Sequence, residues 1–157
     1  IENQDRKYEL RNLDGGILVQ QENNDILTID ELKVVTNTKP TEDTIKSMLF
    51  GWQVLKHVKS NAIITVKDNT TVGIGAGQVS RIDAVDIAIS KSKAAIKGSI
   101  LCSDAFFPFR DSIDKISQYN INGVIQPGGS IKDNEVIDAC NEHNIPMVFT
   151  GRRCFKH

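Results

Sequence analysis

Between residue 99 and the C-terminus, short apolar runs alternate with segments of helical periodicity, and this alternation limits the possible fold more than any other feature of the sequence. Strands are predicted at residues 99–102, 123–125 and 146–149, and helices at about 112–120 and 133–143. This order is typical of a sheet that is parallel in this part and has helices packed on its faces. The sequence therefore predicts an α/β fold.

Each of these three predicted strands leads into an irregular segment. Residues 103–111 hold three phenylalanines and a proline, residues 126–130 read Gln-Pro-Gly-Gly-Ser, and residues 150–157 form a tail with cationic and aromatic side chains. In α/β sheets, ligands bind beyond the carboxyl ends of the strands. We therefore expect the three segments to meet at one rim of the sheet and to form a pocket there.

Two of these segments allow more than one interpretation. The rings of residues 106–109 could offer a flat face to a planar ligand, with Arg110 and Asp111 fixing its edge. Alternatively, the rings fill the end of the core. The turn at residues 126–130 could be a backbone nest for a carboxylate, carbonyl or phosphate group, or simply a tight turn that requires glycine.

A β-hairpin is predicted at residues 61–77, and its second strand alternates Gly73, Gly75 and Gly77. A strand face without side chains implies the close approach of either a helix or a ligand. Arg81 follows at the start of a predicted helix, where a guanidinium and free amides would suit an anion. The glycine spacing differs from the dinucleotide-binding fingerprint, so that function is rejected.

The first third of the chain contains no recognisable functional motif. Strands predicted at residues 7–11 and 16–20 are expected to pack on the edge of the main body. A helix is predicted from Thr41, with Trp52 in the core. Lys56 and His57 near its end could be taken for a catalytic acid and base, but such a pair also stabilises the helix dipole, and we prefer that interpretation.

Composition excludes some classes of function. The 157 residues fit a single domain, and 19 Lys plus Arg against 20 Asp plus Glu lack the basic excess of a nucleic-acid-binding protein. No apolar run has membrane-spanning length, and no signal peptide is visible. Three cysteines without CxxC spacing fit buried thiols in a reducing compartment, by default the cytoplasm. Because the sequence begins with Ile1 and not Met, we expect a piece of a longer chain.

From about residue 45 to the end, the sequence resembles the bifunctional purine biosynthesis family that joins an aminoimidazole carboxamide ribonucleotide (AICAR) formyltransferase to an inosine monophosphate (IMP) cyclohydrolase. The resemblance implies the second lobe of the formyltransferase region, with a three-layer α/β/α, cytidine-deaminase-like fold and a mixed sheet. The H-x-E and P-C-x-x-C patterns of zinc deaminases are absent, so no zinc is expected. The matching motifs are residues 59–63, 73–81, 103–111, 126–130 and 153–157.

The family transfers the formyl group of 10-formyltetrahydrofolate to the 5-amino group of AICAR. By resemblance, Asn61 would contact the carboxamide or steer the formyl group, and His157 would close the site as a supporting catalytic residue. Arg153, through the phosphate, and Phe155 would hold the nucleotide. A monovalent cation such as potassium would lie near Asp104, and the full-length protein would be a homodimer. The folate side would be lined by Arg81, Phe106, Phe109, Asp111, Gln126, Pro127 and Gly128.

Two departures from the family pattern limit these expectations. The family's essential Lys-His pair lies in the first lobe, and residues 59–62 look like its counterpart, with Ser60 where the catalytic histidine would be. In the tail, Cys154 and Lys156 replace the usual His and Arg, so no role is assigned to these two side chains. We therefore expect this chain alone to bind ligand weakly without turnover. The competing interpretations are a non-catalytic ligand-binding domain of the same fold and a zinc deaminase.

Overall fold

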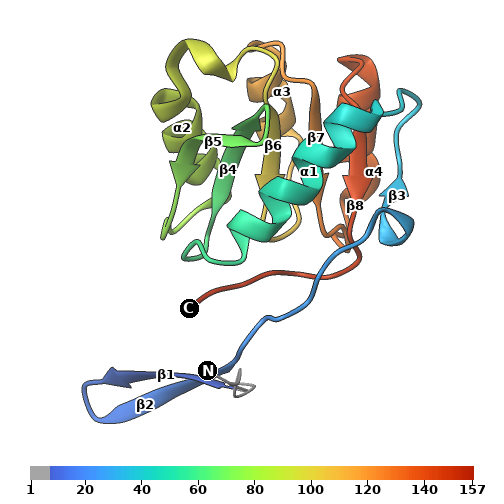
Figure 1. The fold of residues 1–157 in the computed structure, drawn as a ribbon. Helices are drawn as coiled ribbons and strands as arrows, with labels where there is room; N and C mark the ends of the chain where they lie inside the picture. The colour runs from blue at the N-terminus through green and yellow to red at the C-terminus, as the bar shows by residue number, and fades with distance from the viewer. Residues whose placement is uncertain (1–7) are drawn as a thin grey trace.

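A mixed six-stranded sheet forms the centre of the structure (Figure 1). The computed structural model describes residues 8–157. Helices cover both faces of this sheet, so the predicted three-layer α/β/α arrangement is confirmed. In order across the sheet, the strands are β3 (Lys33–Val34), β8 (Met147–Phe149), β7 (Gly123–Gln126), β6 (Ile100–Ser103), β4 (Ile63–Lys67) and β5 (Thr70–Gly75).

The predicted parallel part of the sheet consists of β6, β7 and β8. Strand β4 runs antiparallel to both of its neighbours, so β5 points in the same direction as β6. The edge strand β3, which pairs antiparallel with β8, was not predicted. Its two residues are too short a run to show any periodicity in the sequence.

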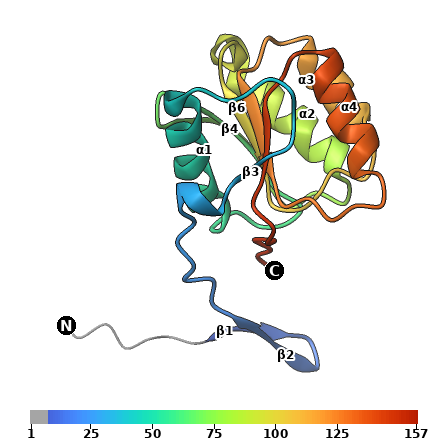
Figure 2. The same cartoon turned by 90° about the vertical axis from the view of Figure 1, so that its right-hand side faces the viewer.

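The helices of the main body lie on the two faces of the sheet, as Figure 2 shows. Helix α1 (Glu42–Leu55) packs Met48, Trp52 and Leu55 into the first core layer, which confirms the predicted core position of Trp52. The opposite layer includes α2 (Arg81–Ser92), α3 (Asp111–Ser117) and α4 (Asp133–Glu142). The main body also contains two short 3-10 helices, Ile29–Glu31 and Lys93–Ile96.

The glycine-rich strand β5 is approached by a helix and not by a ligand. A Cβ atom on Gly73 would lie 2.1 Å from the carbonyl oxygen of Ala88, and one on Gly75 would lie 2.0 Å from that of Ala84. Both carbonyls belong to α2. Glycine on this strand therefore permits the close packing of α2 against the sheet.

The strands β1 (Tyr8–Leu13) and β2 (Gly16–Gln21) form a separate hairpin outside the main sheet (Figures 1 and 2). The prediction that they pack on the edge of the main body is wrong, because β3 occupies the edge beside β8 and the hairpin pairs with no strand of the main sheet. Lys7, which was included in the first predicted strand, lies outside the described residues.

Candidate functional site

The irregular segments meet at one rim of the sheet, as predicted. Ile63, the first residue of β4, pairs with Gly75 at the end of β5 and with Ser103 at the end of β6. Gln126 and Phe149, the last residues of β7 and β8, pair with each other at the same edge. The C-terminal tail runs along this edge (Figure 1). The sheet therefore places residues 59–62, 76–80, 104–110, 127–130 and 150–157 on one side of the molecule.

A buried carboxylate joins three of these segments. The side chain of Asp104 is fully buried and accepts hydrogen bonds from Ser60 Oγ at 2.5 Å and from the Ala62 amide at 3.1 Å. It also forms an ion pair with Arg81, whose side chain is itself 7% exposed. The backbone carbonyl of Asp104 accepts from the amide of Cys154, at 3.1 Å. Asp104 therefore connects the segment before β4, the start of α2 and the C-terminal tail, and we call it the centre of the rim.

Asn61 is held in a defined orientation by this centre. Its Oδ1 accepts a hydrogen bond from Arg81 Nη2 at 3.1 Å, and its Nδ2 donates to the carbonyl of Gln78 at 2.8 Å. Arg81 Nη1 also donates to the carbonyl of Ala62 at 3.1 Å. The guanidinium of Arg81 therefore points into the protein toward Asn61 and Asp104, and direct contact of Arg81 with a ligand stays a prediction.

The aromatic segment divides between the two interpretations offered for it. Phe107 is fully buried in the core, whereas Phe106 is half-buried and Phe109 is 54% exposed. The guanidinium carbon of Arg153 lies 5.4 Å from the ring centroid of Phe106 and 5.6 Å from that of Phe155. Lys132 Nζ lies 4.9 Å from the ring centroid of Phe109. One ring therefore fills the core, and two remain at the rim beside cations.

Gln126 is buried and supports the aromatic segment from inside. Its Oε1 accepts a hydrogen bond from the amide of Phe107 at 3.1 Å, and its Nε2 lies 3.2 Å from the sulfur of Met147. The side chain has no exposed surface, so it fixes the aromatic segment instead of reaching outward. Pro127 and Gly128 are buried as well, and Gly129 is the exposed residue of this turn.

The turn after β7 requires glycine and already holds a carboxylate. Gly128 has φ +72°, and a Cβ atom there would lie 2.4 Å from the ring of Phe149. Asp133, at the start of α4, accepts hydrogen bonds from the amides of Gly129 at 2.7 Å and Ser130 at 3.1 Å. The predicted anion nest therefore exists and is filled by a side chain of the same molecule, and its use by a ligand stays a prediction.

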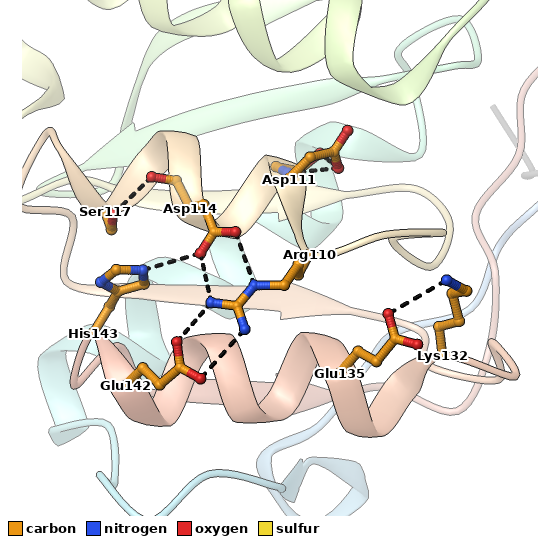
Figure 3. A network of polar contacts seen from close by, with 9 residues as sticks. Arg110, Asp111, Asp114, Ser117, Lys132, Glu135, Glu142 and His143 are labelled. Atoms are coloured by element: carbon orange, nitrogen blue, oxygen red, sulfur yellow. Dashed lines mark hydrogen bonds and ion pairs between the residues drawn. The ribbon is translucent and has the colours of Figure 1, made fainter.

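Arg110 does not extend from the rim toward a ligand, because Asp114 of α3 and Glu142 of α4 hold it in place (Figure 3). It donates to Asp114 at 2.8 and 2.9 Å and to Glu142 at 2.6 Å, and His143 Nε2 lies 3.1 Å from Asp114. Asp111 lies away from this network and is exposed; it accepts a hydrogen bond from the Ser112 amide at 2.7 Å.

This network predicts a pH-dependent stability. The hydrogen bonds from Arg110, more than those from His143, lower the pKa of Asp114 from 3.8 to about 2. Its contribution to the free energy of unfolding is complete above pH 3.8 and is lost as the pH falls through about 2. The urea midpoint of the parent should exceed that of Asp114→Asn at pH 5, and the difference should vanish near pH 2. If the difference in urea midpoint did not change with pH, the ion pair between Arg110 and Asp114 would not be its cause.

The tail residues line a hollow against a loop that the sequence analysis did not include in the site. Arg153 and Phe155 border a space of about 370 Å³ together with Gln21, Glu22, Asn23 and Asp25. The rings of Phe155 and His157 lie 5.7 Å apart between centroids. A smaller hollow of about 140 Å³ is bordered by His57, Phe155 and Lys156. Residues 21–25 are polar residues typical of turns, and nothing in the sequence around them indicates contact with the tail.

The structure therefore gathers the predicted site residues into two groups. Asn61 and Arg81 lie together around Asp104, and Phe106, Arg153, Phe155 and His157 form a neighbouring aromatic and cationic group. Gly128 and Phe109 lie farther along the same rim, and Asp111 lies apart, at the start of α3.

The three cysteine thiols do not contribute to the site. Cys102, Cys140 and Cys154 are all buried and unbridged, which confirms the interpretation as buried thiols. Burial raises the pKa of all three thiols, that of Cys140 to about 12, so they are poor nucleophiles at neutral pH.

Within residues 8–157, no group of three or more His, Cys, Asp or Glu side chains could hold a metal ion. Nor does this part of the chain contain a helix both long and apolar enough to cross a membrane.

Comparison with known proteins identifies similar sequences over the whole chain. The profile of the family described as "AICARFT/IMPCHase bienzyme" matches residues 1–91. The bifunctional purine biosynthesis protein PurH of Persephonella marina is 52% identical over the full chain, and that of Aquifex aeolicus is 50% identical over 96% of it. The matches cover 31% and 30% of those relatives, so the chain spans about a third of their length. A solved structure of RibD from Acinetobacter baumannii is 12% identical over 69% of the chain, with a TM-score of 0.49.

Proposed function

Because the chain belongs to the AICARFT/IMPCHase bienzyme family, we propose that it supplies part of an AICAR formyltransferase site. In this proposal the complete protein transfers a formyl group from 10-formyltetrahydrofolate to the 5-amino group of AICAR in purine biosynthesis, and also has IMP cyclohydrolase activity. The observation that carries the proposal is the fixed amide of Asn61, held by Arg81 and the carbonyl of Gln78 beside the group formed by Phe106, Arg153 and Phe155.

The reaction explains why such a site needs these residue types. The weakly nucleophilic amine attacks the formyl carbon, and a tetrahedral intermediate with an oxyanion forms. Its collapse breaks the bond between the formyl carbon and N10 of the folate, while the amine loses one proton and N10 of the departing tetrahydrofolate gains one. Catalysis therefore depends on holding two substrates in contact and on donors aimed at the developing charge. Asn61 Nδ2 uses one hydrogen for Gln78, which leaves its second hydrogen for the carboxamide or the formyl oxygen.

The tail residues fit the nucleotide. Arg153 has a cationic head that suits the phosphate, and its position beside two rings restricts its motion. Phe155 offers an aromatic face to the base, and the exposed ring of His157 lies next to it, where it would close the site. The folate would lie farther along the rim, against Phe109, Asp111 and the Gly128 turn.

The proposed site does not require a metal cation. The carboxylate of Asp104 is already neutralised by Arg81 and accepts hydrogen bonds from Ser60 and Ala62. Potassium near Asp104 therefore stays a prediction, and no step of the proposal depends on it. The catalytic Lys-His pair expected from the resemblance lies outside this chain, so residues 1–157 alone should bind AICAR weakly and show no turnover.

The decisive test replaces Asn61 with alanine in the full-length protein. Loss of one aligned donor should lower the formyl transfer rate by about 100-fold. Tetrahydrofolate production measures this rate, while cyclohydrolase activity in the same preparation shows that the protein is folded. Asn134→Ala, an exposed asparagine on α4, is the matched control and should retain the parent rate. A normal formyl transfer rate in Asn61→Ala would favour the alternative, a non-catalytic ligand-binding domain of the same fold.

A further inference from the structure

The β1–β2 hairpin contacts the far end of the chain. The side-chain amide of Gln20 donates to the carbonyl of Phe155 at 2.7 Å, across 135 residues of sequence. The same amide accepts a hydrogen bond from the backbone N–H of His157 at 2.9 Å. One side chain therefore satisfies a backbone acceptor and a backbone donor two residues apart in the tail.

A second contact comes from the same face of the hairpin. Glu9 pairs with Gln20 in the register of β1 and β2, so both side chains project from one face. Glu9 Oε1 lies 2.6 Å from Lys156 Nζ. The opposite face of the hairpin carries apolar side chains that are more than half exposed, namely Tyr8, Leu10, Ile17 and Val19. The side-chain hydrogen bonds and the ion pair to the tail come from the face that carries Glu9 and Gln20.

The tail is held between the hairpin and the main body. Lys156 faces the body through its backbone: its carbonyl accepts from the Ser60 amide at 2.9 Å, and its amide donates to Ser60 Oγ at 3.1 Å. The backbone groups of Phe155 and His157 point the other way, to Gln20. This alternation is that of an extended strand, although residues 152–157 form none. Gln20 takes the place of a neighbouring strand.

We propose that the hairpin is a clasp on the C-terminal tail, and that Gln20 is a positioning residue that holds Phe155 and His157 at the rim. The functional part of this inference rests on the proposed formyltransferase site. Phe155 flanks Arg153, so a tail fixed by Gln20 presents the cation and both rings in one arrangement. A tail released from Gln20 keeps the contacts of Lys156 with Ser60 but loses the order of Phe155 and His157.

The clasp itself is tested on residues 1–157 by amide hydrogen exchange, followed by NMR at His157. Removing both hydrogen bonds in Gln20→Ala should accelerate this exchange by about tenfold, with the urea midpoint unchanged. Gln20→Glu keeps the acceptor for His157 and loses the donor to Phe155, so its exchange rate should be intermediate. Asn12→Ala, an exposed asparagine at the other end of β1, should exchange at the parent rate. Unchanged exchange in Gln20→Ala overturns the clasp, whatever the protein binds.

The positioning role is tested in the full-length protein by steady-state kinetics. Gln20→Ala should raise the KM for AICAR by about tenfold while the KM for 10-formyltetrahydrofolate stays within about twofold, because only the nucleotide contacts the tail. A purely structural defect would lower activity toward both substrates. Faster exchange at His157 with an unchanged KM for AICAR would overturn the positioning role of Gln20. It would not contradict the proposed formyl transfer, which Asn61→Ala tests separately.

Discussion

Replacing Gly75 with alanine should lower the free energy of unfolding by about 3 kcal/mol, the upper end of the range for overpacked cores. The added Cβ atom would lie 2.0 Å from the carbonyl oxygen of Ala84 and 2.8 Å from its carbonyl carbon. These are backbone atoms of α2, which cannot rotate away as a flexible side chain can. The helix must therefore shift away from the sheet, which destabilises the protein. Because α2 begins with Arg81, the shift should also move the donor that orients Asn61.

Urea denaturation followed by the fluorescence of Trp52, the one tryptophan of the chain, measures this effect. Trp52 is buried against the opposite face of the sheet and reports unfolding of the core. Gly16→Ala is the matched control, because nothing lies within 4 Å of its added Cβ and its φ is ordinary for any residue. A loss below about 1 kcal/mol in Gly75→Ala would show that α2 has room to move.

Replacing Arg81 with methionine should lower the free energy of unfolding by about 3–5 kcal/mol. Methionine fills much of the same space but leaves the carboxylate of Asp104 buried without its counter-ion. The hydrogen bonds from Ser60 and Ala62 do not neutralise the charge. Asn61 would also lose the donor that orients its Oδ1, so formyl transfer should fall even under conditions where the variant is folded.

A double variant distinguishes the loss of a charge pair from a general packing defect. Arg81→Met with Asp104→Asn contains no unpaired buried charge, so it should be more stable than Arg81→Met alone. Lys46→Met removes an exposed ion pair with Asp43 and should change stability by less than about 0.5 kcal/mol. If Arg81→Met lowered the free energy of unfolding no more than Lys46→Met does, the ion pair of Arg81 and Asp104 would not hold the rim together.

Much of the fold could be predicted because its signals are local. The predicted strands of the second half correspond to β6, β7 and β8, and the predicted helix from Thr41 corresponds to α1. Periodicity missed the shortest strand, and it predicted the strands β1 and β2 but not where their hairpin lies. Strand β3 has two residues, and the hairpin of β1 and β2 exposes apolar side chains on one face, a pattern that resembles packing against a body.

The candidate site was predicted in location but not in internal detail. The sequence placed Arg81 at a helix start, which is correct. It placed Gln126 in the turn after the strand, whereas Gln126 is the last residue of β7. That the side chains of both point inward, to Asn61 and to the amide of Phe107, depends on segments 19 or more residues away. The occupation of the glycine turn by Asp133 and the contact of Gln20 with the tail were equally invisible.

By itself, the sequence determined that a mixed α/β sheet forms and that aromatic, glycine-rich and cationic segments leave one edge of it. Hydrophobic periodicity and strand–helix order specify these features, and both are properties of neighbouring residues. Only the tertiary structure decided which polar groups at that edge satisfy one another. A buried charge such as Asp104 must find its partner wherever the packed chain brings one, and here packing brings Arg81 from α2, Ser60 from the segment before β4, and the tail from the far end of the chain.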